Sequence, residues 1–220
     1  MKNKLSLIEK MIGISVLFNM LLLFVRIIYT QELTYGFYIW NTILALIPLT
    51  ISRKIILKKK WKWFTIIPLF IWLLFLPNAP YLITDIFHFE KRNPIPLWFD
   101  LMIVMSAAWN GLIICIISIL QIESFVIKTV QIKWIATLLS PTCILLCGYG
   151  VFIGRFNRFN SWDVITKPHN IAYNFLLQLR HPFQHIHVWG FTIVFASFLA
   201  IFYYTIVLLK RMQQNAPLGL

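Results

Sequence analysis

Polar side chains recur at helical spacing in the segment Leu-Pro-Asn-Ala-Pro-Tyr-Leu-Ile-Thr-Asp-Ile-Phe-His. Asn78, Tyr81, Thr84, Asp85 and His88 follow the i, i+3, i+4, i+7 pattern of one helix face. A carboxylate and an imidazole one turn apart can serve as general acid and base, so Asp85 and His88 are the predicted catalytic residues. Asn78 and Tyr81 share their face and are predicted to bind substrate. In the structural alternative, His88 hydrogen-bonds Thr84 or a neighbouring helix.

A second group of charged residues follows the apolar run that ends near residue 153. Arg155 and Arg158 are three residues apart, which predicts that they share a helix face and hold a phosphate or carboxylate. Asp163 is predicted to bind substrate beside them. The alternative is that the arginines anchor the helix at lipid headgroups, or pair with Asp85, Asp100 or Asp163.

The same polar residues suggest a metal site. Asp85 and His88 offer two ligands on consecutive turns, and His181 and His185 offer two more. Three protein ligands and an open position are typical of catalytic zinc, so a divalent transition metal such as zinc is the predicted cofactor. Neither spacing is a recognised zinc signature. The alternative is that the later histidines are solvated at the membrane interface.

The elements that must position these side chains are transmembrane helices. Hydrophobic residues make up 60% of the chain and charged residues 12%, which excludes an ordinary soluble domain. Each long apolar run approaches the roughly 20 residues that cross a bilayer. We predict an all-α, polytopic bundle of about six spans in a single membrane domain, residues 1–220. The predicted spans are residues 11–29, 37–51, 63–76 with a continuation to 89, 97–120, 134–153 and 188–209.

Pro77 and Pro80 interrupt the third span. Each lacks the N–H that an interior helix position donates, so a kink is expected there. A polar stripe past that kink is costly in a bilayer unless it faces protein or water. The stripe is therefore predicted to line a polar site.

The distribution of basic residues predicts the orientation. The formal net charge is +13, and most Lys and Arg residues fall in segments that share one side with the N-terminus. The positive-inside rule then places both termini in the cytoplasm. The charge flanks apolar spans, so nucleic-acid binding is not expected. All five histidines fall at the outer side or its boundary.

A few polar residues lie inside the predicted spans. Asn19, Asn110 and Ser140 are expected to link helices through hydrogen bonds. Arg26 is predicted either to extend outward to the interface or to pair with an outer acid such as Asp85. Asp100 lies near the start of a span, where the helix dipole favours a carboxylate without any catalytic role.

Three segments resemble a known family. They are the stretch from Leu76 to His88, Pro-Leu-Trp-Phe-Asp at 96–100, and Gly-Arg-Phe-Asn-Arg-Phe-Asn-Ser-Trp-Asp at 154–163. Together they resemble bacterial domain-of-unknown-function family 1361. The resemblance implies a bacterial cytoplasmic-membrane protein and brings no reaction or catalytic residue with it.

The leading interpretation is a membrane enzyme, a hydrolase or transferase, acting on an anionic lipid-linked or envelope substrate at the outer face. The competing class is a non-enzymatic membrane partner or small-solute transporter whose outer polar residues are structural or bind a ligand. The chain contains no Gly-x-Ser-x-Gly elbow, Walker loop or Gly-x-Gly-x-x-Gly motif, so serine hydrolase, NTPase and dinucleotide-binding functions lack support.

Overall fold

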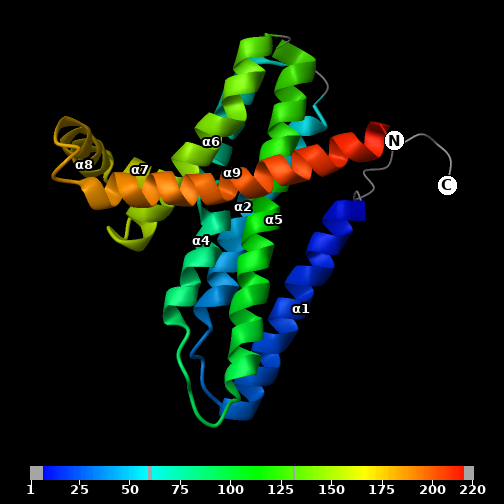
Figure 1. The fold of residues 1–220 in the computed structure, drawn as a ribbon, viewed down its shortest axis with the longest axis vertical. Coiled ribbons are helices and arrows are strands. Elements are labelled where there is room, and N and C mark those ends of the chain that lie inside the picture. The colour runs from blue at the N-terminus through cyan, green and yellow to red at the C-terminus, as the bar shows by residue number, and fades with distance from the viewer. Residues whose placement is uncertain (1–6, 59–60, 131, 216–220) are drawn as a thin grey trace. The chain divides into compact units, whose positions relative to one another are not determined.

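The computed structural model describes residues 7–58, 61–130 and 132–215, and within these ranges every regular element is a helix (Figure 1). The elements are α1 (Leu7–Thr30), α2 (Phe37–Ile56), η1 (Trp63–Thr65), α3 (Ile66–Phe75), α4 (Asn78–Thr84), η2 (Asp85–His88), α5 (Leu97–Val130), α6 (Lys133–Arg155), α7 (Asp163–Thr166), α8 (Pro168–Arg180) and α9 (Ile186–Asn215).

Six of the helical stretches in the described residues are long and apolar enough to cross a membrane. They are α1, α2, the stretch from η1 to η2, α5, α6 and α9. The predicted polytopic all-α fold is therefore confirmed. Several helices extend beyond the predicted spans, most of all α5, which continues from residue 120 to Val130. Buried Ile122, Phe125 and Val126 recur at i, i+3, i+4 spacing, so an apolar face carries the helix onward.

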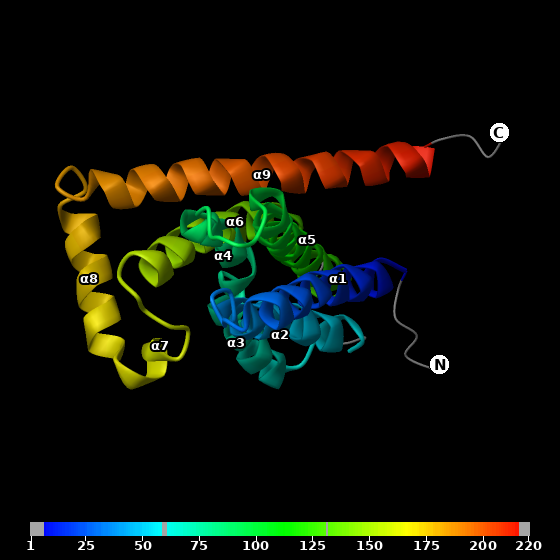
Figure 2. The same ribbon diagram turned by 90° about the horizontal axis from the view of Figure 1, so that it is seen from below.

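The chain divides into two compact units, Met1–Lys133 and Trp134–Leu220, which are described separately. In unit 1, α5 packs against α1, α2 and α4, and α3 packs against α2. Figure 2 shows these helices grouped around one another. α5 has the largest buried share of the six spans and forms the centre of this unit. The expectation of a single membrane domain stays a prediction.

A glycine allows α4 to lie close to α5. A Cβ atom added to Gly111 would collide with the carbonyl oxygen of Ala79 and lie 3.0 Å from the Cβ of Leu82. Small residues at helix crossings permit such close backbone approach in membranes. Gly111 therefore fixes how near α5 lies to α4, the helix that leads into the η2 turn of Asp85 and His88.

The third span divides at Leu76 and Pro77, between α3 and α4. The kink expected at Pro77 and Pro80 stays a prediction. Pro77 keeps right-handed helical dihedral angles, with φ −63° and ψ −21°. The side-chain amide of Asn78 donates to the carbonyl of Phe75 over 2.9 Å. Asn78 thus satisfies a backbone acceptor beside Pro77 and Pro80, which have no N–H to donate.

Polar side chains join α1 to α5 across most of their length. Ser15 donates to Asn110 over 2.6 Å, and the Asn19 amide donates to Ser106 over 2.6 Å and to the Ile103 carbonyl over 2.8 Å. Rising α1 numbers meet falling α5 numbers, as in an antiparallel pair. The prediction that Asn19 and Asn110 link helices is confirmed.

Unit 2 contains α6 to α9. The hydroxyl groups of Ser140 and Tyr203 lie 2.8 Å apart and link α6 to α9, which confirms the role predicted for Ser140. A Cβ atom on Gly148 would lie 2.6 Å from the Thr192 carbonyl oxygen, so these two helices also approach closely. α8 joins both helices through Gln178, which accepts from the Tyr149 hydroxyl and, at its carbonyl, from the indole of Trp189.

Candidate functional site

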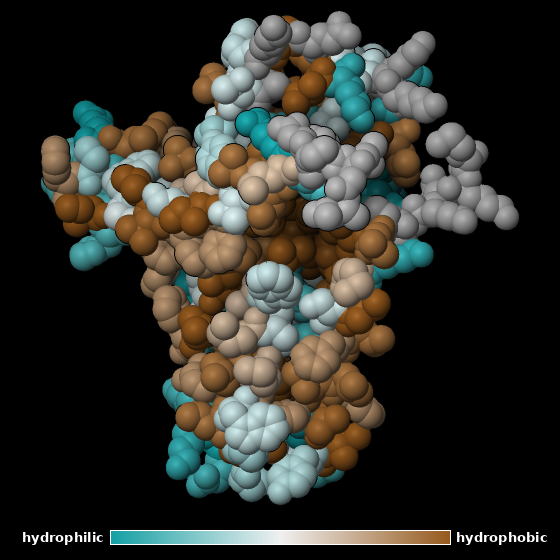
Figure 3. Space-filling view, turned by 45° about the vertical axis from the view of Figure 1, so that its right-hand side comes forward, coloured by the Kyte–Doolittle hydropathy of each residue, from teal (hydrophilic) through white to brown (hydrophobic). Residues whose placement is uncertain are grey.

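The polar residues of interest in unit 1 gather at the end that holds segments 31–36 and 89–96, here termed the distal end. There α1 ends, α2 begins, η2 ends and α5 begins, at the lower end of Figure 1. Figure 3 shows hydrophilic side chains at this lower tip, below sides covered mostly by hydrophobic ones. We term the following residues the distal cluster: Arg26, Tyr35, Tyr38, Asn41, Asp85, His88, Arg92 and Asp100.

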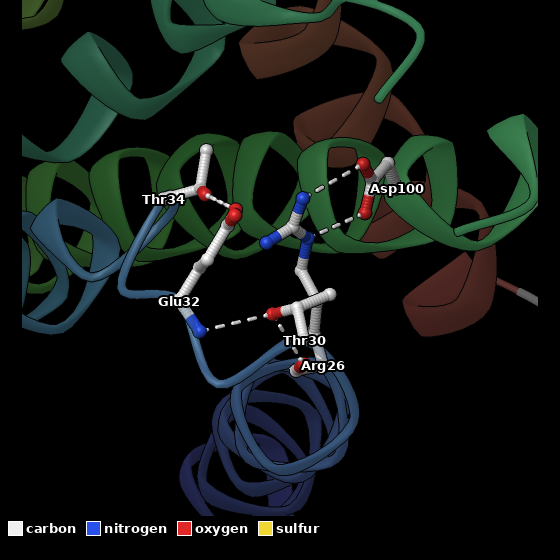
Figure 4. A network of polar contacts seen from close by, with 5 residues as sticks. All are labelled: Arg26, Thr30, Glu32, Thr34 and Asp100. Carbon is white, nitrogen blue, oxygen red and sulfur yellow. Dashed lines mark hydrogen bonds and ion pairs between the residues drawn. The ribbon is translucent and has the colours of Figure 1, made fainter. Parts of the chain in front are cut away.

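Arg26 and Asp100 form a buried ion pair between α1 and α5. The Nε of Arg26 lies 2.8 Å from Oδ1 of Asp100, and Nη2 lies 3.3 Å from Oδ2 (Figure 4). The side chains are only 2% and 1% exposed, so neither charge is compensated by water. The prediction that Arg26 pairs with an outer acid is confirmed, and that acid is Asp100 rather than Asp85, the example given. Asp100 was expected to interact with the helix dipole. The pairing gives it a second role, as the partner of the buried Arg26 charge.

Two arginines approach the ring of Tyr35. The guanidinium carbon of Arg26 is 4.6 Å from the centre of the Tyr35 ring, and that of Arg92 is 5.7 Å from it. Both distances suit cation–π contacts. Burial, followed by the charge of Asp100, raises the pKa of the Tyr35 phenol, while Arg92 and Arg26 act in the opposite direction. The phenol therefore stays neutral beside the two cations at neutral pH.

Asp85 faces the interior of unit 1. Its side chain is 1% exposed, and its Oδ2 accepts from the Asn41 amide on α2 over 3.1 Å. Thr84 is also buried, and its hydroxyl donates to the carbonyl of Tyr81. The polar stripe thus faces protein at these two positions, as expected. The structural alternative had Thr84 as a hydrogen-bond partner of His88, but the Thr84 hydroxyl donates to the Tyr81 carbonyl instead.

His88 lies at the other end of the same η2 turn and is exposed. Its ring meets the edge of Phe37, with 5.3 Å between ring centres. Phe37 stacks on Tyr38 at 4.7 Å and lies 6.2 Å from Tyr35, so one aromatic group links His88 to the ring that both arginines approach. The predicted acid/base residues therefore occupy one turn, with the carboxylate inside and the imidazole outside.

The two predicted substrate-binding residues on α4 are Asn78 and Tyr81. Tyr81 is half-buried, one turn before Asp85. Asn78 is half-buried at the start of α4, where its amide serves the Phe75 carbonyl. Asn78 thus has a backbone role that the spacing argument did not foresee. Binding of substrate by either residue stays a prediction.

The remaining predicted residues lie in unit 2. α6 ends at Arg155, and Arg158 lies beyond it with a left-handed φ of 58°. The prediction that the two arginines share a helix face is wrong for this reason. Asp163 accepts from the backbone amide of Asn160 over 2.8 Å and from the Thr166 hydroxyl over 3.0 Å. The backbone N–H of Asn160, which donates to the carboxylate, is the main reason that the pKa of Asp163 is lowered. This carboxylate organises its own turn.

The four predicted metal ligands are divided between the units. Asp85 and His88 belong to unit 1, and His181 and His185 belong to the turn that precedes α9. Within the described residues, no three His, Cys, Asp or Glu side chains are grouped in a way that could hold a metal ion. The zinc site stays a prediction that joins ligands from two units.

Four residues of the distal cluster escaped sequence reasoning, namely Tyr35, Tyr38, Asn41 and Arg92. Asn41 is a polar residue in the apolar run of α2. A polar side chain in such a run could have indicated a buried polar contact. Tyr35 and Arg92 lie in connecting segments without periodicity, so only the fold brings them beside Arg26.

Comparison with known protein families gives one finding. A family model described as "Protein of unknown function (DUF1361)" matches residues 40–202. The chain belongs to this family. The part that matches the DUF1361 model includes Asn41, Asp85, His88, Arg92 and Asp100, whereas Arg26 and Tyr35 precede it. Neither the curated proteins nor the solved structures contain a match to this chain.

Proposed function

We propose that this DUF1361 protein is a membrane enzyme, a hydrolase or transferase, that acts on an anionic lipid-linked or envelope substrate at the distal end. The observation that carries the proposal is the η2 turn, which holds a buried carboxylate at Asp85 and an exposed imidazole at His88. Ionisable side chains are costly to place at the edge of a bilayer without a function. Histidine titrates near neutral pH and can both accept and donate a proton.

In this mechanism, His88 exchanges a proton with the substrate, and Asp85 acts with it as the second member of an acid/base pair. Asn41 holds the Asp85 carboxylate in place over 3.1 Å. Tyr81 lies one turn away and is the proposed contact to the substrate on the same helix. A bilayer-embedded substrate fits, because the cluster lies at the ends of membrane-spanning helices.

We also propose a bacterial cytoplasmic membrane as the location, with both termini in the cytoplasm. The support is the excess of basic residues in the segments on the N-terminal side. In this orientation the distal cluster faces the outside, where envelope substrates occur.

The test compares lipid and envelope extracts from bacteria that express the wild type, Asp85→Asn or His88→Ala. His169→Ala is the matched control, because His169 is an exposed histidine of unit 2. We expect mass spectrometry to detect a product in the strains that express the wild type or His169→Ala. The same product should be missing in the Asp85→Asn and His88→Ala strains, at unchanged protein abundance. Profiles that are identical in all four strains would contradict the enzyme.

A non-enzymatic membrane partner is the second candidate, favoured by the Asn41–Asp85 hydrogen bond. This bond joins α2 to η2, so it can stabilise the fold even if the protein catalyses no reaction. In that case Asp85→Asn lowers protein abundance and His88→Ala changes nothing. Measuring abundance in the membrane fraction for each variant therefore separates the two candidates.

A further inference from the structure

Two arginines from separate parts of unit 1 approach the same aromatic ring. Arg26 lies on α1 and Arg92 lies between η2 and α5, yet both guanidinium groups lie within 5.7 Å of the centre of the Tyr35 ring. Two cations that share one ring repel each other. A nearby anion would relieve that repulsion.

Each of these arginines has a buried N–H group without an acceptor among the described residues. The nitrogens are Nη1 of Arg26 and Nε of Arg92. Buried donors in proteins almost always find an acceptor, and an unsatisfied one indicates a missing partner. The Arg26 side chain is 2% exposed, so bulk water does not solvate its guanidinium group.

The resident carboxylates leave these two nitrogens unoccupied. Asp100 binds Nε and Nη2 of Arg26, and Glu90 lies 3.5 Å from Nη2 of Arg92. In Figure 4, the third nitrogen of Arg26 points away from Asp100, toward the segment that carries Glu32 and Thr34. The Glu32 carboxylate accepts from the Thr34 hydroxyl over 3.1 Å.

We infer that Arg26 and Arg92 form a binding site for a phosphate group. A phosphate presents several acceptor oxygens in different directions, which suits donors from two separate arginines. The inference rests on the proposed function and deepens it, because it names the charged group of the substrate. Leu33 lies in the segment 31–36 and Trp98 in the first turn of α5, and they are 74% and 64% exposed, which suits contact with the acyl chains of a phospholipid.

The test measures binding to the detergent-purified full chain, without turnover. One probe is short-chain phosphatidylglycerol and the other is inorganic phosphate, each titrated by calorimetry. Arg92→Gln removes one of the donors while leaving the Arg26–Asp100 pair intact. Lys91→Gln is the matched control, since it removes the same charge from the neighbouring exposed position.

We expect Arg92→Gln to weaken phosphatidylglycerol binding by about tenfold or more, and Lys91→Gln by no more than about twofold. Glu32→Gln removes a carboxylate on the side to which Nη1 points, so it is expected to tighten binding. Inorganic phosphate that competes with the lipid would identify the phosphate alone as the ligand. A lipid that binds without such competition would show that acyl chains are required.

Equal losses in Arg92→Gln and Lys91→Gln would overturn the site, because general charge would then explain binding. Absence of binding by both probes to the folded wild type would also overturn it and assign the two donors to water. Thermal unfolding of each variant shows whether it is folded. The Glu32→Gln variant is expected to bind more tightly, so its result cannot be explained by a loss of folded protein. Asp85→Asn should bind like the wild type, so failure of catalysis and failure of this site are distinguishable.

Discussion

At the scale of single residues, the Arg26–Asp100 pair is a feature whose disruption should strongly lower the stability of the protein. Both side chains are at most 2% exposed, and they join α1 to α5 through two hydrogen bonds. Removing one partner leaves the other charge buried and alone, whereas removing both leaves an apolar contact.

We therefore expect Asp100→Leu to lower the free energy of unfolding by about 3–5 kcal/mol. The double variant Arg26→Met with Asp100→Leu should lose clearly less than Asp100→Leu alone. Equilibrium unfolding in mixed detergent micelles measures both. Glu90→Gln is the control, because the Glu90 side chain is 71% exposed in its pair with Arg92 and should change stability by less than about 1 kcal/mol. Additive losses in the double variant would contradict the pairing.

Asp163 gives a prediction about pH. Its folded pKa lies below the ordinary value of 3.8, chiefly because the Asn160 amide donates to the charged carboxylate. This contribution is complete well above pH 3.8 and is lost as the pH falls through the lowered folded pKa. We expect Asp163→Asn to speed hydrogen exchange of residues 160–167 at pH 7, after correction for intrinsic rates. At a pH below the folded pKa, the variant and the wild type should exchange alike. A difference that persists in acid would contradict the assignment.

At the scale of elements, Gly111 sets the contact between α4 and α5. Any side chain there meets the backbone of Ala79, which cannot rotate away. We expect Gly111→Ala to destabilise unit 1 by about 1–3 kcal/mol, as overpacking does. Gly13→Ala is the control on α1, since a Cβ there has nothing within 4 Å and improves helix propensity. Unfolding midpoints of the two variants measured in the same detergent check this, and equal midpoints would refute the close contact.

The interruption between α3 and α4 shows how far an element can be predicted. Pro77 marked the position because proline removes a helical N–H at any depth in the bilayer. The spacing of Asn78 with Tyr81 and Asp85 suggested a substrate contact, but the Asn78 amide donates to the Phe75 carbonyl. The need for a backbone partner arises because the nearby prolines have no N–H to donate, so periodicity alone did not reveal it.

At the scale of the whole molecule, the orientation in the membrane can be measured directly. The three native cysteines are buried, so single introduced cysteines are the main targets for labelling. Leu33→Cys lies in the distal segment and Leu57→Cys follows α2, and these leucines are 74% and 51% exposed. We expect an impermeant maleimide to label position 33 in intact cells and position 57 only after permeabilisation. The reverse pattern would invert the proposed orientation and place the distal cluster inside.

Sequence reasoning predicted the number of spans, because a bilayer imposes length and hydropathy on each helix separately. It also identified Asn19 and Asn110 as links between helices. It did not find that Arg26 pairs with Asp100 or that Tyr35 lies beside Arg92, since these contacts depend on which helices become neighbours. For this reason sequence reasoning proposed only two of the eight residues of the distal cluster, Asp85 and His88, as site residues.

The Arg26–Asp100 pair also bears on how the chain is made. The two residues are separated by 74 positions, so Arg26 leaves the ribosome on the order of ten seconds before its partner. During that interval a buried-type arginine is present in a first helix that has no counter-ion. The nascent helix must then remain beside the insertion machinery, or keep its guanidinium among lipid headgroups, until α5 is synthesised. Final seating of α1 is therefore a late step of biogenesis, although α1 is the first helix to emerge.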